Sequence, residues 1–222
     1  MQILVDTKPR FRAATEKHPL DPRGRKRRDA AWRYEHWTKG PIVPNSVLVD
    51  LWSPHPFRGL WQNPGEIAIM QSGEPTDWKR MLQLLVAFTD AHVKGRARHI
   101  TADEVLDFYG RTTWSIMPKN DVFYRASRAG RERLVGLTLG AQRVHGLPIM
   151  VRNMASRVTL YHLDEDKDMK YLRENGIPDS VSPRGDFIFK QWKKQPGGPV
   201  GEPITGRLKL PQTYLDQLSD AA

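Results

Sequence analysis

The chain has 222 residues, of which 39% are hydrophobic and 27% charged, so it can bury the core of one sizeable domain and is neither a disordered tail nor a fibrous repeat. Its 35 Lys and Arg exceed its 25 Asp and Glu, and the formal charge of +10 favours a polyanionic partner, most commonly nucleic acid. With no cysteine, a disulfide framework, a Cys-ligated zinc and a thiol nucleophile are excluded.

Neither a signal peptide nor a membrane span is visible in the sequence. The short apolar run Ile3–Val5 leads directly into Asp6 and Lys8, and no window approaches the ~20 apolar residues that cross a bilayer. We therefore expect a soluble, cytoplasmic protein with no membrane segment in this chain.

The positive charge is concentrated near the N-terminus. Residues 1–40 hold eleven Lys or Arg and five Asp or Glu, which is +6 of the total +10. The basic run between Arg23 and Arg28 is followed by aromatic residues. Cations bind phosphates, and aromatic rings stack on unpaired bases. A solvated surface loop is the commoner explanation of such a run. The candidate DNA-binding residues are Arg23, Arg25, Lys26, Arg27 and Arg28.

Short apolar runs bounded by turn residues predict buried strands, and runs with three- and four-residue apolar spacing predict helices between them. The clearest helix is 76–92, with Thr76 or Asp77 as its N-cap, and Gly176 and Pro178 follow the last helix. The predicted strands are 2–5, 46–51, 66–70, 97–102, 134–141 and 157–162, and the predicted helices are 76–92, 121–132 and 166–175.

This alternation predicts an α/β fold, with a mainly parallel sheet and helices on both of its faces. We expect one domain over residues 1–192, with a basic excursion rich in Pro and Trp at about 9–64. Residues 193–222 are expected to form a Pro/Gly-rich linker and a C-terminal tail.

The most informative segment is the predicted strand that ends in Asp103 and Glu104. A sheet delivers such residues at the carboxyl ends of its strands, where α/β proteins bind ligands. The first carboxylate can hold Mg²⁺ through its water shell, and the second can polarise an attacking water. On this segment alone, two acids that favour a helix N-terminus are the simpler explanation.

Gln142 ends the next predicted strand, and it reaches the same pocket if the two strands are neighbours. There it can contact a γ-phosphate or orient water; otherwise it is a polar residue at a strand end. Arginines precede this strand at 128, 131 and 133, and a solvated helix face is the alternative explanation for them.

The ordered set of these segments resembles the motor domains of the FtsK–HerA superfamily of P-loop ATPases, which are DNA translocases and packaging or conjugation pumps. In that family a strand ending in Asp-Glu is followed by an Arg-bearing helix and a strand ending in Ala-Thr-Gln-Arg-Pro. Here that strand reads Gly140-Ala141-Gln142-Arg143, with Val144 in place of the proline. The resemblance covers roughly residues 97–189, and 3–8 is similar to the family strand that ends in Asp-x-Lys.

The resemblance implies a RecA-like core, ATP and Mg²⁺ as ligands, and a homo-oligomeric ring, a hexamer, around double-stranded DNA. Asp103 would be the Mg²⁺ ligand, Glu104 the general base and Gln142 the sensor of the γ-phosphate. Arg131 would reach the neighbouring subunit's site, with Arg128 and Arg133 as rivals for that role.

One motif of the family is missing from the sequence. A Gly-x-x-x-x-Gly-Lys-Ser/Thr segment is expected a few tens of residues before the strand at 2–5, yet no Gly-Lys pair occurs in the 222 residues. Either the N-terminal part is lacking, or another chain supplies it, or the site has decayed. We therefore expect an incomplete ATP-hydrolysing motor or, alternatively, a catalytically inactive, basic nucleic-acid-binding protein.

Metal chemistry of other kinds has little support in the sequence. The seven histidines show no His-x-His or His-x₃-His spacing. One acidic segment could be compared with an EF-hand loop, but it lacks the glycine and the terminal glutamate of that motif. A solvated turn and a helix N-terminus are therefore favoured for Asp164, Glu165, Asp166 and Asp168.

Overall fold

The computed structural model divides the chain into two compact units, Met1–Gln142 (unit 1) and Arg143–Ala222 (unit 2). The residues that it describes are 1–8, 11–15, 42–63, 65–73, 75–91, 96–108, 123, 125–126, 132–147, 149–161, 163, 165–174, 177, 188–193 and 201–207. The partition predicted from composition, with a boundary after residue 192, stays a prediction.

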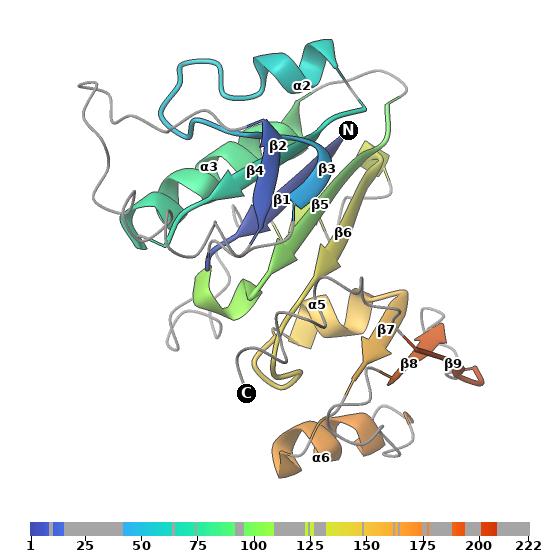
Figure 1. Ribbon diagram of the computed structural model, residues 1–222. Coiled ribbons are helices and arrows are strands. Elements are labelled where there is room, and N and C mark those ends of the chain that lie inside the picture. The colour runs from blue at the N-terminus through green and yellow to red at the C-terminus, as the bar shows by residue number, and fades with distance from the viewer. Residues whose placement is uncertain are drawn as a thin grey trace, which may run out of the picture. The chain divides into compact units, whose positions relative to one another are not determined.

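Unit 1 is built on a six-stranded sheet in the order β2-β3-β4-β1-β5-β6 (Figure 1). Every neighbouring pair is parallel, so the predicted α/β fold with a parallel sheet is confirmed. The strands are β1 (Gln2–Asp6), β2 (Arg12–Thr15), β3 (Ile42–Leu48), β4 (Ile67–Gln71), β5 (Arg98–Asp103) and β6 (Val135–Leu139).

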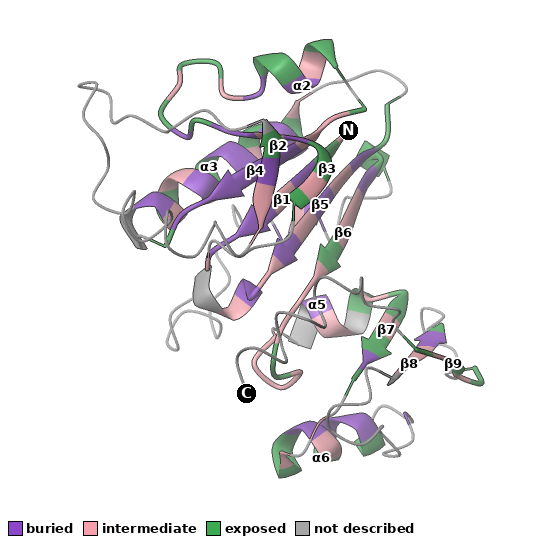
Figure 2. Cartoon of the chain, viewed as in Figure 1, coloured by how far each residue is buried: buried purple, intermediate pink, exposed green. Residues whose placement is uncertain are grey.

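The core of unit 1 lies between one face of this sheet and helix α3 (Pro75–Asp90). The register places Ile3, Ala68 and Ile100 side by side on that face, and all three are buried. Helix α3 adds buried apolar residues one turn apart, among them Met81, Leu85 and Phe88. In Figure 2 the buried colour runs along β4, β1, β5 and α3. The central strands are therefore held rigidly from that side.

Arg98, at the start of β5, ties the end of α3 to the sheet. Its guanidinium donates to the carbonyl oxygens of Phe88, Thr89 and Ala91, and to that of Arg133 just before β6. Burial lowers the pKa of Arg98, and its cation lies at the helix C-terminus, where the helix dipole favours positive charge. These bonds satisfy carbonyls that the last turn of α3 leaves without helical partners.

On the opposite face of the sheet, a glycine makes room for a histidine. His99 Nε2 lies 2.8 Å from Thr138 Oγ1 on β6, and a Cβ on Gly136 would lie 2.5 Å from His99 Nδ1. Burial lowers the pKa of His99. This histidine is therefore packed against β6, where burial favours its neutral form.

Unit 2 contains α5 (Ile149–Met154), α6 (Asp166–Glu174) and a three-stranded antiparallel sheet of β7 (Arg157–Leu160), β8 (Ile188–Lys193) and β9 (Ile204–Arg207). Its core joins Leu160 and Trp192 of the sheet to Tyr171 and Leu172 of α6, with Ile177 beyond the helix. Strand β9 lies in the stretch for which the sequence predicts a linker and tail.

Most predicted elements of the two units are present with shifted ends. Helix α3 begins at Pro75, so Asp77 lies inside its first turn and accepts a hydrogen bond from Ser72 Oγ at 2.7 Å. Strand β3 begins at Ile42, earlier than predicted, and the short helix α2 (Arg58–Gln62) was not predicted. Of the predicted helix 121–132, only residues 123, 125, 126 and 132 are described, and they are helical. Among the described residues, no helix has the length and apolar character to cross a bilayer.

Candidate active site at the carboxyl edge of the sheet

Asp103 ends β5 at the carboxyl edge of the sheet, beside Asp6 at the end of β1. The ladder between β5 and β6 continues past β6, because Gly140 N–H donates to Ala102 O at 2.8 Å. A Cβ on Gly140 would lie 2.9 Å from Asp103 Oδ1. Glycine at this position therefore leaves space for the Asp103 carboxylate.

Glu104 follows in a left-handed conformation with φ of 48° and is 8% exposed. A non-glycine residue rarely adopts this conformation, and such strain is concentrated at functional sites. The bond from Val105 N–H to Gly140 O, 3.0 Å long, fixes the backbone just after Glu104. The backbone of Glu104 is thus held in place by the sheet.

Two side chains from neighbouring strand ends contact this carboxylate. Gln142 Nε2 donates to Glu104 Oε1 at 2.8 Å, and Lys8 Nζ lies 3.7 Å from the same oxygen. The structure therefore brings Gln142 and Glu104 together. Lys8, to which sequence reasoning gave no role, joins them; the Asp-x-Lys pattern after β1 was the available signal.

A second polar group lies at the ends of β1 and β4. Asp6 Oδ2 accepts hydrogen bonds from Gln71 Nε2 at 2.7 Å and from the backbone N–H of Phe11 at 3.0 Å, and Gln71 Nε2 also donates to Phe11 O. Both side chains are buried. This group anchors the chain after β1 and so fixes the turn that carries Lys8.

Most of the arginines predicted for the site or for DNA binding lie outside the described residues. Arg131, Arg128 and the basic run Arg23–Arg28 lie outside the described residues. Arg133, a rival of Arg131, precedes β6 at the amino edge of the sheet and forms an ion pair with Asp90 of α3, as does Arg125 at 2.9 Å. This contact places Arg133 at the opposite end of β6 from Glu104 and Gln142.

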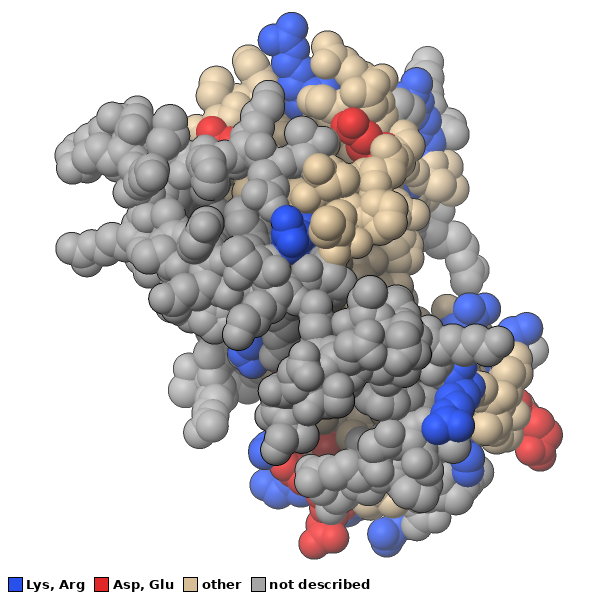
Figure 3. Space-filling view, viewed as in Figure 1, with Lys and Arg blue, Asp and Glu red and all other residues tan. Residues whose placement is uncertain are grey.

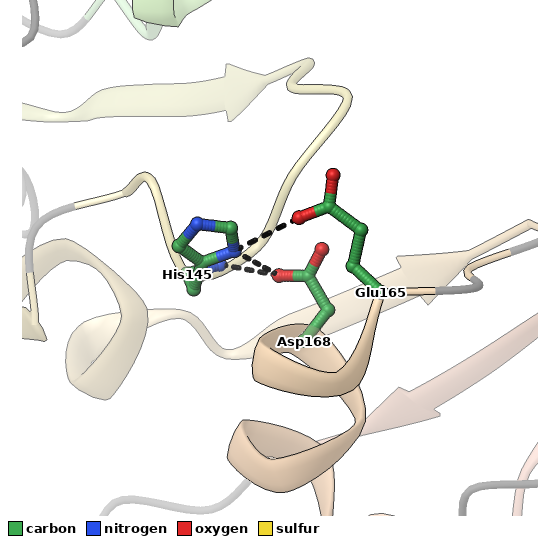
Figure 4. A group of neighbouring side chains, drawn as sticks. All are labelled: His145, Glu165 and Asp168. Atoms are coloured by element: carbon green, nitrogen blue, oxygen red, sulfur yellow. Dashed lines mark hydrogen bonds and ion pairs between the residues drawn. The ribbon is translucent and has the colours of Figure 1, made fainter.

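Unit 2 contains a cluster that the sequence did not predict. His145, Glu165 and Asp168 place a nitrogen and two carboxylate oxygens within 4.8 Å of one another (Figure 4). Asp168 is 1% exposed, and its Oδ1 accepts hydrogen bonds from the backbone N–H of His145 at 2.6 Å and faces His145 Nδ1 at 3.0 Å. The three residues are of metal-ligating types.

The contacts within this cluster favour a structural clamp, meaning a set of hydrogen bonds and ion pairs that holds the loop at His145, over a metal centre. Arg143 Nη2 lies 2.6 Å from Glu165 Oε1, so a cation already balances that carboxylate. The buried Asp168 satisfies the backbone of the loop that holds His145. Asp168 is therefore a buried hydrogen-bond acceptor, whereas the sequence favoured a solvated turn at this position.

An open cavity of about 510 Å³ lies elsewhere in unit 1, next to α2. It contains none of the predicted site residues, and its charged side chain is Arg58. Its lining is Pro54, His55, Pro56, Phe57, Arg58, Trp61 and Gln62.

No protein-family model matches the chain, and no curated protein matches it. Among solved structures, the chain is similar to B204, the DNA-packaging ATPase from Sulfolobus turreted icosahedral virus, with 15% identity over 63% of this chain and 67% of that chain and a TM-score of 0.45. It is also similar to the genome packaging NTPase B204 from Sulfolobus turreted icosahedral virus 2 in complex with AMPPCP, with 13% identity, 95% and 98% coverage and a TM-score of 0.49. The complex of that NTPase with ATP-gammaS gives 12% identity, the same coverage of 95% and 98%, and a TM-score of 0.49.

Proposed function

We propose that the chain is the ATP-hydrolysing motor module of a double-stranded DNA translocase or packaging pump. The observation that carries the proposal is the pairing of Glu104 with Gln142 beside Asp103 at the carboxyl edge of a parallel sheet. On this proposal, Asp103 would serve Mg²⁺, Glu104 the attacking water and Gln142 the phosphate, from adjacent strand ends.

Asp103 fits the role of a Mg²⁺ ligand, because Gly140 leaves its carboxylate the space that a side chain would fill. Mg²⁺ keeps several waters and binds through one or two carboxylates and the phosphates of its nucleotide. When bound, the ion would neutralise charge on the phosphates of ATP. Asp103 would hold and orient it from the end of β5.

Glu104 would act as the general base. It would accept a proton from the water that attacks the γ-phosphorus, and the products would be ADP and phosphate. Its Oε1 accepts a hydrogen bond from Gln142 and lies near Lys8. A γ-phosphate would offer the Gln142 amide a second acceptor, so that Gln142 would release the Glu104 oxygen that must take the proton.

The remaining roles extend the same proposal. Arg131 would stabilise transition-state charge in the site of a neighbouring subunit, within a hexameric ring around DNA. Arg23, Arg25, Lys26, Arg27 and Arg28 would contact DNA phosphates.

The test is Mg²⁺-dependent hydrolysis at millimolar ATP, with and without double-stranded DNA. Because the 222 residues contain no Gly-Lys pair, we expect weak ATP binding. We expect Glu104→Gln to lower the hydrolysis rate about 10²- to 10⁴-fold, as loss of a general base does, with unchanged ATP affinity. The matched control is Glu66→Gln, the same chemical change just before β4 at the opposite edge of the sheet. An unchanged rate in Glu104→Gln would refute the assigned base.

A second function is supported by the formal charge of +10. On this proposal the chain is an inactive scaffold that binds nucleic acid. Wild-type protein would then show no hydrolysis, and its DNA affinity would be unchanged by ATP and Mg²⁺ and would fall steeply with salt. Alanine substitution of Arg25–Arg28 would weaken that binding; unchanged affinity in this variant would remove the basic run from the interface.

A further inference from the structure

The antiparallel sheet of unit 2 has two unlike faces. In an antiparallel sheet, directly paired residues share a face. The pairs Val158–Trp192 and Leu160–Lys190 therefore lie on one side, and Val158, Leu160 and Trp192 on that side pack against α6. We call this the inner face.

The other side, the outer face, follows from the alternate pairs. Arg157 pairs with Lys193 and Thr159 with Gln191. Phe189 pairs with Gly206, and Gln191 pairs with Ile204 on its other side. Tyr161 follows β7 on the same side, because its ring centroid lies 6.2 Å from that of Phe189. The described outer face thus consists of Arg157, Thr159, Tyr161, Phe189, Gln191, Lys193, Ile204 and Gly206.

This outer face combines exposed aromatic, apolar and cationic groups. Tyr161 is 43% exposed and Ile204 56% exposed, and Arg157 and Lys193 are also exposed. The three strands read RVTL, IFKQWK and ITGR, so none of their residues is acidic. In Figure 3, Lys and Arg side chains are visible over the part of unit 2 that holds these strands, with acidic side chains beside them at its edge. The described face is therefore suited to a polyanion that also presents flat, unpaired rings.

Gly206 makes room for the ring of Phe189. A Cβ on Gly206 would lie 2.5 Å from the Cζ atom of Phe189 and 2.8 Å from one of its Cε atoms, so the ring lies across β9. The Tyr161 ring is tilted by 59° to it. Gln191 Nε2 donates to Thr159 Oγ1 at 2.8 Å between the aromatic and the cationic ends of the face. The face thus offers an aromatic end and a cationic end on one surface.

We propose that this outer face binds single-stranded nucleic acid, with bases stacked on Tyr161 and Phe189 and phosphates near Arg157 and Lys193. Aromatic side chains provide stacking surfaces for unpaired bases, and cations follow the backbone. Residues 157–161 extend over roughly 13 Å at about 3.3 Å per residue, which is room for two or three nucleotides. Paired bases expose no free ring face, so a duplex of equal length would bind more weakly.

The proposal is independent of nucleotide hydrolysis, and its test omits ATP and Mg²⁺. Fluorescence anisotropy would compare a fluorescent single strand of twelve thymidines with a twelve-base-pair duplex at low salt. We expect tighter binding of the single strand, and about tenfold or greater loss of affinity in Tyr161→Ala. Trp52→Ala, which removes an exposed aromatic residue of unit 1, and Lys167→Ala on α6 are matched controls that should leave the affinity unchanged.

A second measurement uses the wild-type protein, so its result does not depend on whether a variant folds. Ultraviolet crosslinking of the bound thymidine strand to wild-type protein, followed by peptide mapping, should place crosslinks in 157–161 or 188–193. Crosslinks found only elsewhere, for example in residues 23–40, would overturn the proposal. A second result would also overturn it: a dimer in sedimentation that binds no single strand and that dissociates in Tyr161→Ala. The outer face would then contact a second copy of the chain.

Discussion

The two sheets of this protein place their polar residues differently. In the parallel sheet of unit 1, the face that packs on α3 is apolar, and the polar residues gather where strands end, at Asp103, Glu104 and Gln142. In the antiparallel sheet of unit 2, polar residues such as Arg157, Thr159 and Gln191 lie along the outer face, among exposed apolar and aromatic residues. Parallel strands buried by helices leave only their ends for chemistry, whereas an antiparallel sheet covered on one side leaves a surface. The first arrangement suits a reaction centre, and the second suits an extended ligand.

The largest expected effect comes from removing the centre of the unit 2 core. Trp192 is 1% exposed and packs with Leu160 and Tyr171. We expect Trp192→Ala to lower the free energy of unfolding by about 3–5 kcal/mol, measured by urea denaturation. If the two sheets are independent in stability, Ile100→Ala should destabilise unit 1 by about 2–5 kcal/mol without altering the unfolding of unit 2. Identical unfolding of both units in both variants would contradict that independence.

The cluster around Asp168 provides the next effect. We expect Asp168→Ala to lower the free energy of unfolding by about 1–3 kcal/mol, because the backbone N–H of His145 loses its buried acceptor. A chelator such as EDTA should leave the Tm of the wild-type protein unchanged. A fall of Tm on chelation, restored by Zn²⁺, would show that the cluster is a metal centre and not a clamp.

A pair of glycines sharpens the comparison between the sheets. Gly136 and Gly206 each face a ring from the neighbouring strand, and an added Cβ would lie 2.5 Å from His99 Nδ1 or Phe189 Cζ. His99 is held by Thr138, so we expect Gly136→Ala to destabilise by about 2 kcal/mol. Phe189 lies on the outer face and can move outward, so Gly206→Ala should destabilise by about 1 kcal/mol. Equal losses in urea denaturation would show that the outer face is as tightly packed as the sheet of unit 1.

The smallest effect is a pH dependence confined to unit 1. Burial lowers the pKa of His99 below its ordinary value of 6.5, so the unfolded chain takes up a proton there before the folded chain does. The stability from neutral His99 is fully present above about pH 6.5 and is lost as the pH falls towards the folded pKa. We expect His99→Gln to lose about 1–2 °C less in Tm than wild type between pH 7.5 and 5.5. An equal loss of Tm in both proteins would show that His99 does not contribute to the loss of stability at low pH.

Sequence reasoning predicted five of the six parallel strands, because β1, β3, β4, β5 and β6 contain short apolar runs. It missed β2, which reads RAAT and has no such run, and its sixth predicted strand, 157–162, corresponds to β7 in the antiparallel sheet. It also placed Glu104 and Gln142 at one edge, since parallel neighbours end on the same side. It gave no role to Lys8, because the contact depends on the turn that Asp6 and Gln71 fix.

The antiparallel sheet was harder to predict for a physical reason. Strand β8 reads IFKQWK, with polar residues on both faces, and β9 is a four-residue strand that contains Gly206. Neither has the clean alternation that marks a strand with one buried face. The contact of His145 with Asp168 joins residues 23 positions apart, so no local spacing indicates it.

The guanidinium of Arg98 has a consequence for how unit 1 opens to solvent. One side chain binds the carbonyls that end α3 and the carbonyl of Arg133 before β6, so displacement of Arg98 removes the bonds of both segments at once. In hydrogen–deuterium exchange, the amides of the last turn of α3 and of the first residues of β6 should therefore lose protection together, as one cooperative unit. The helix end and the strand start would then share a single opening free energy, although more than forty residues separate Phe88 from Val135 in the chain.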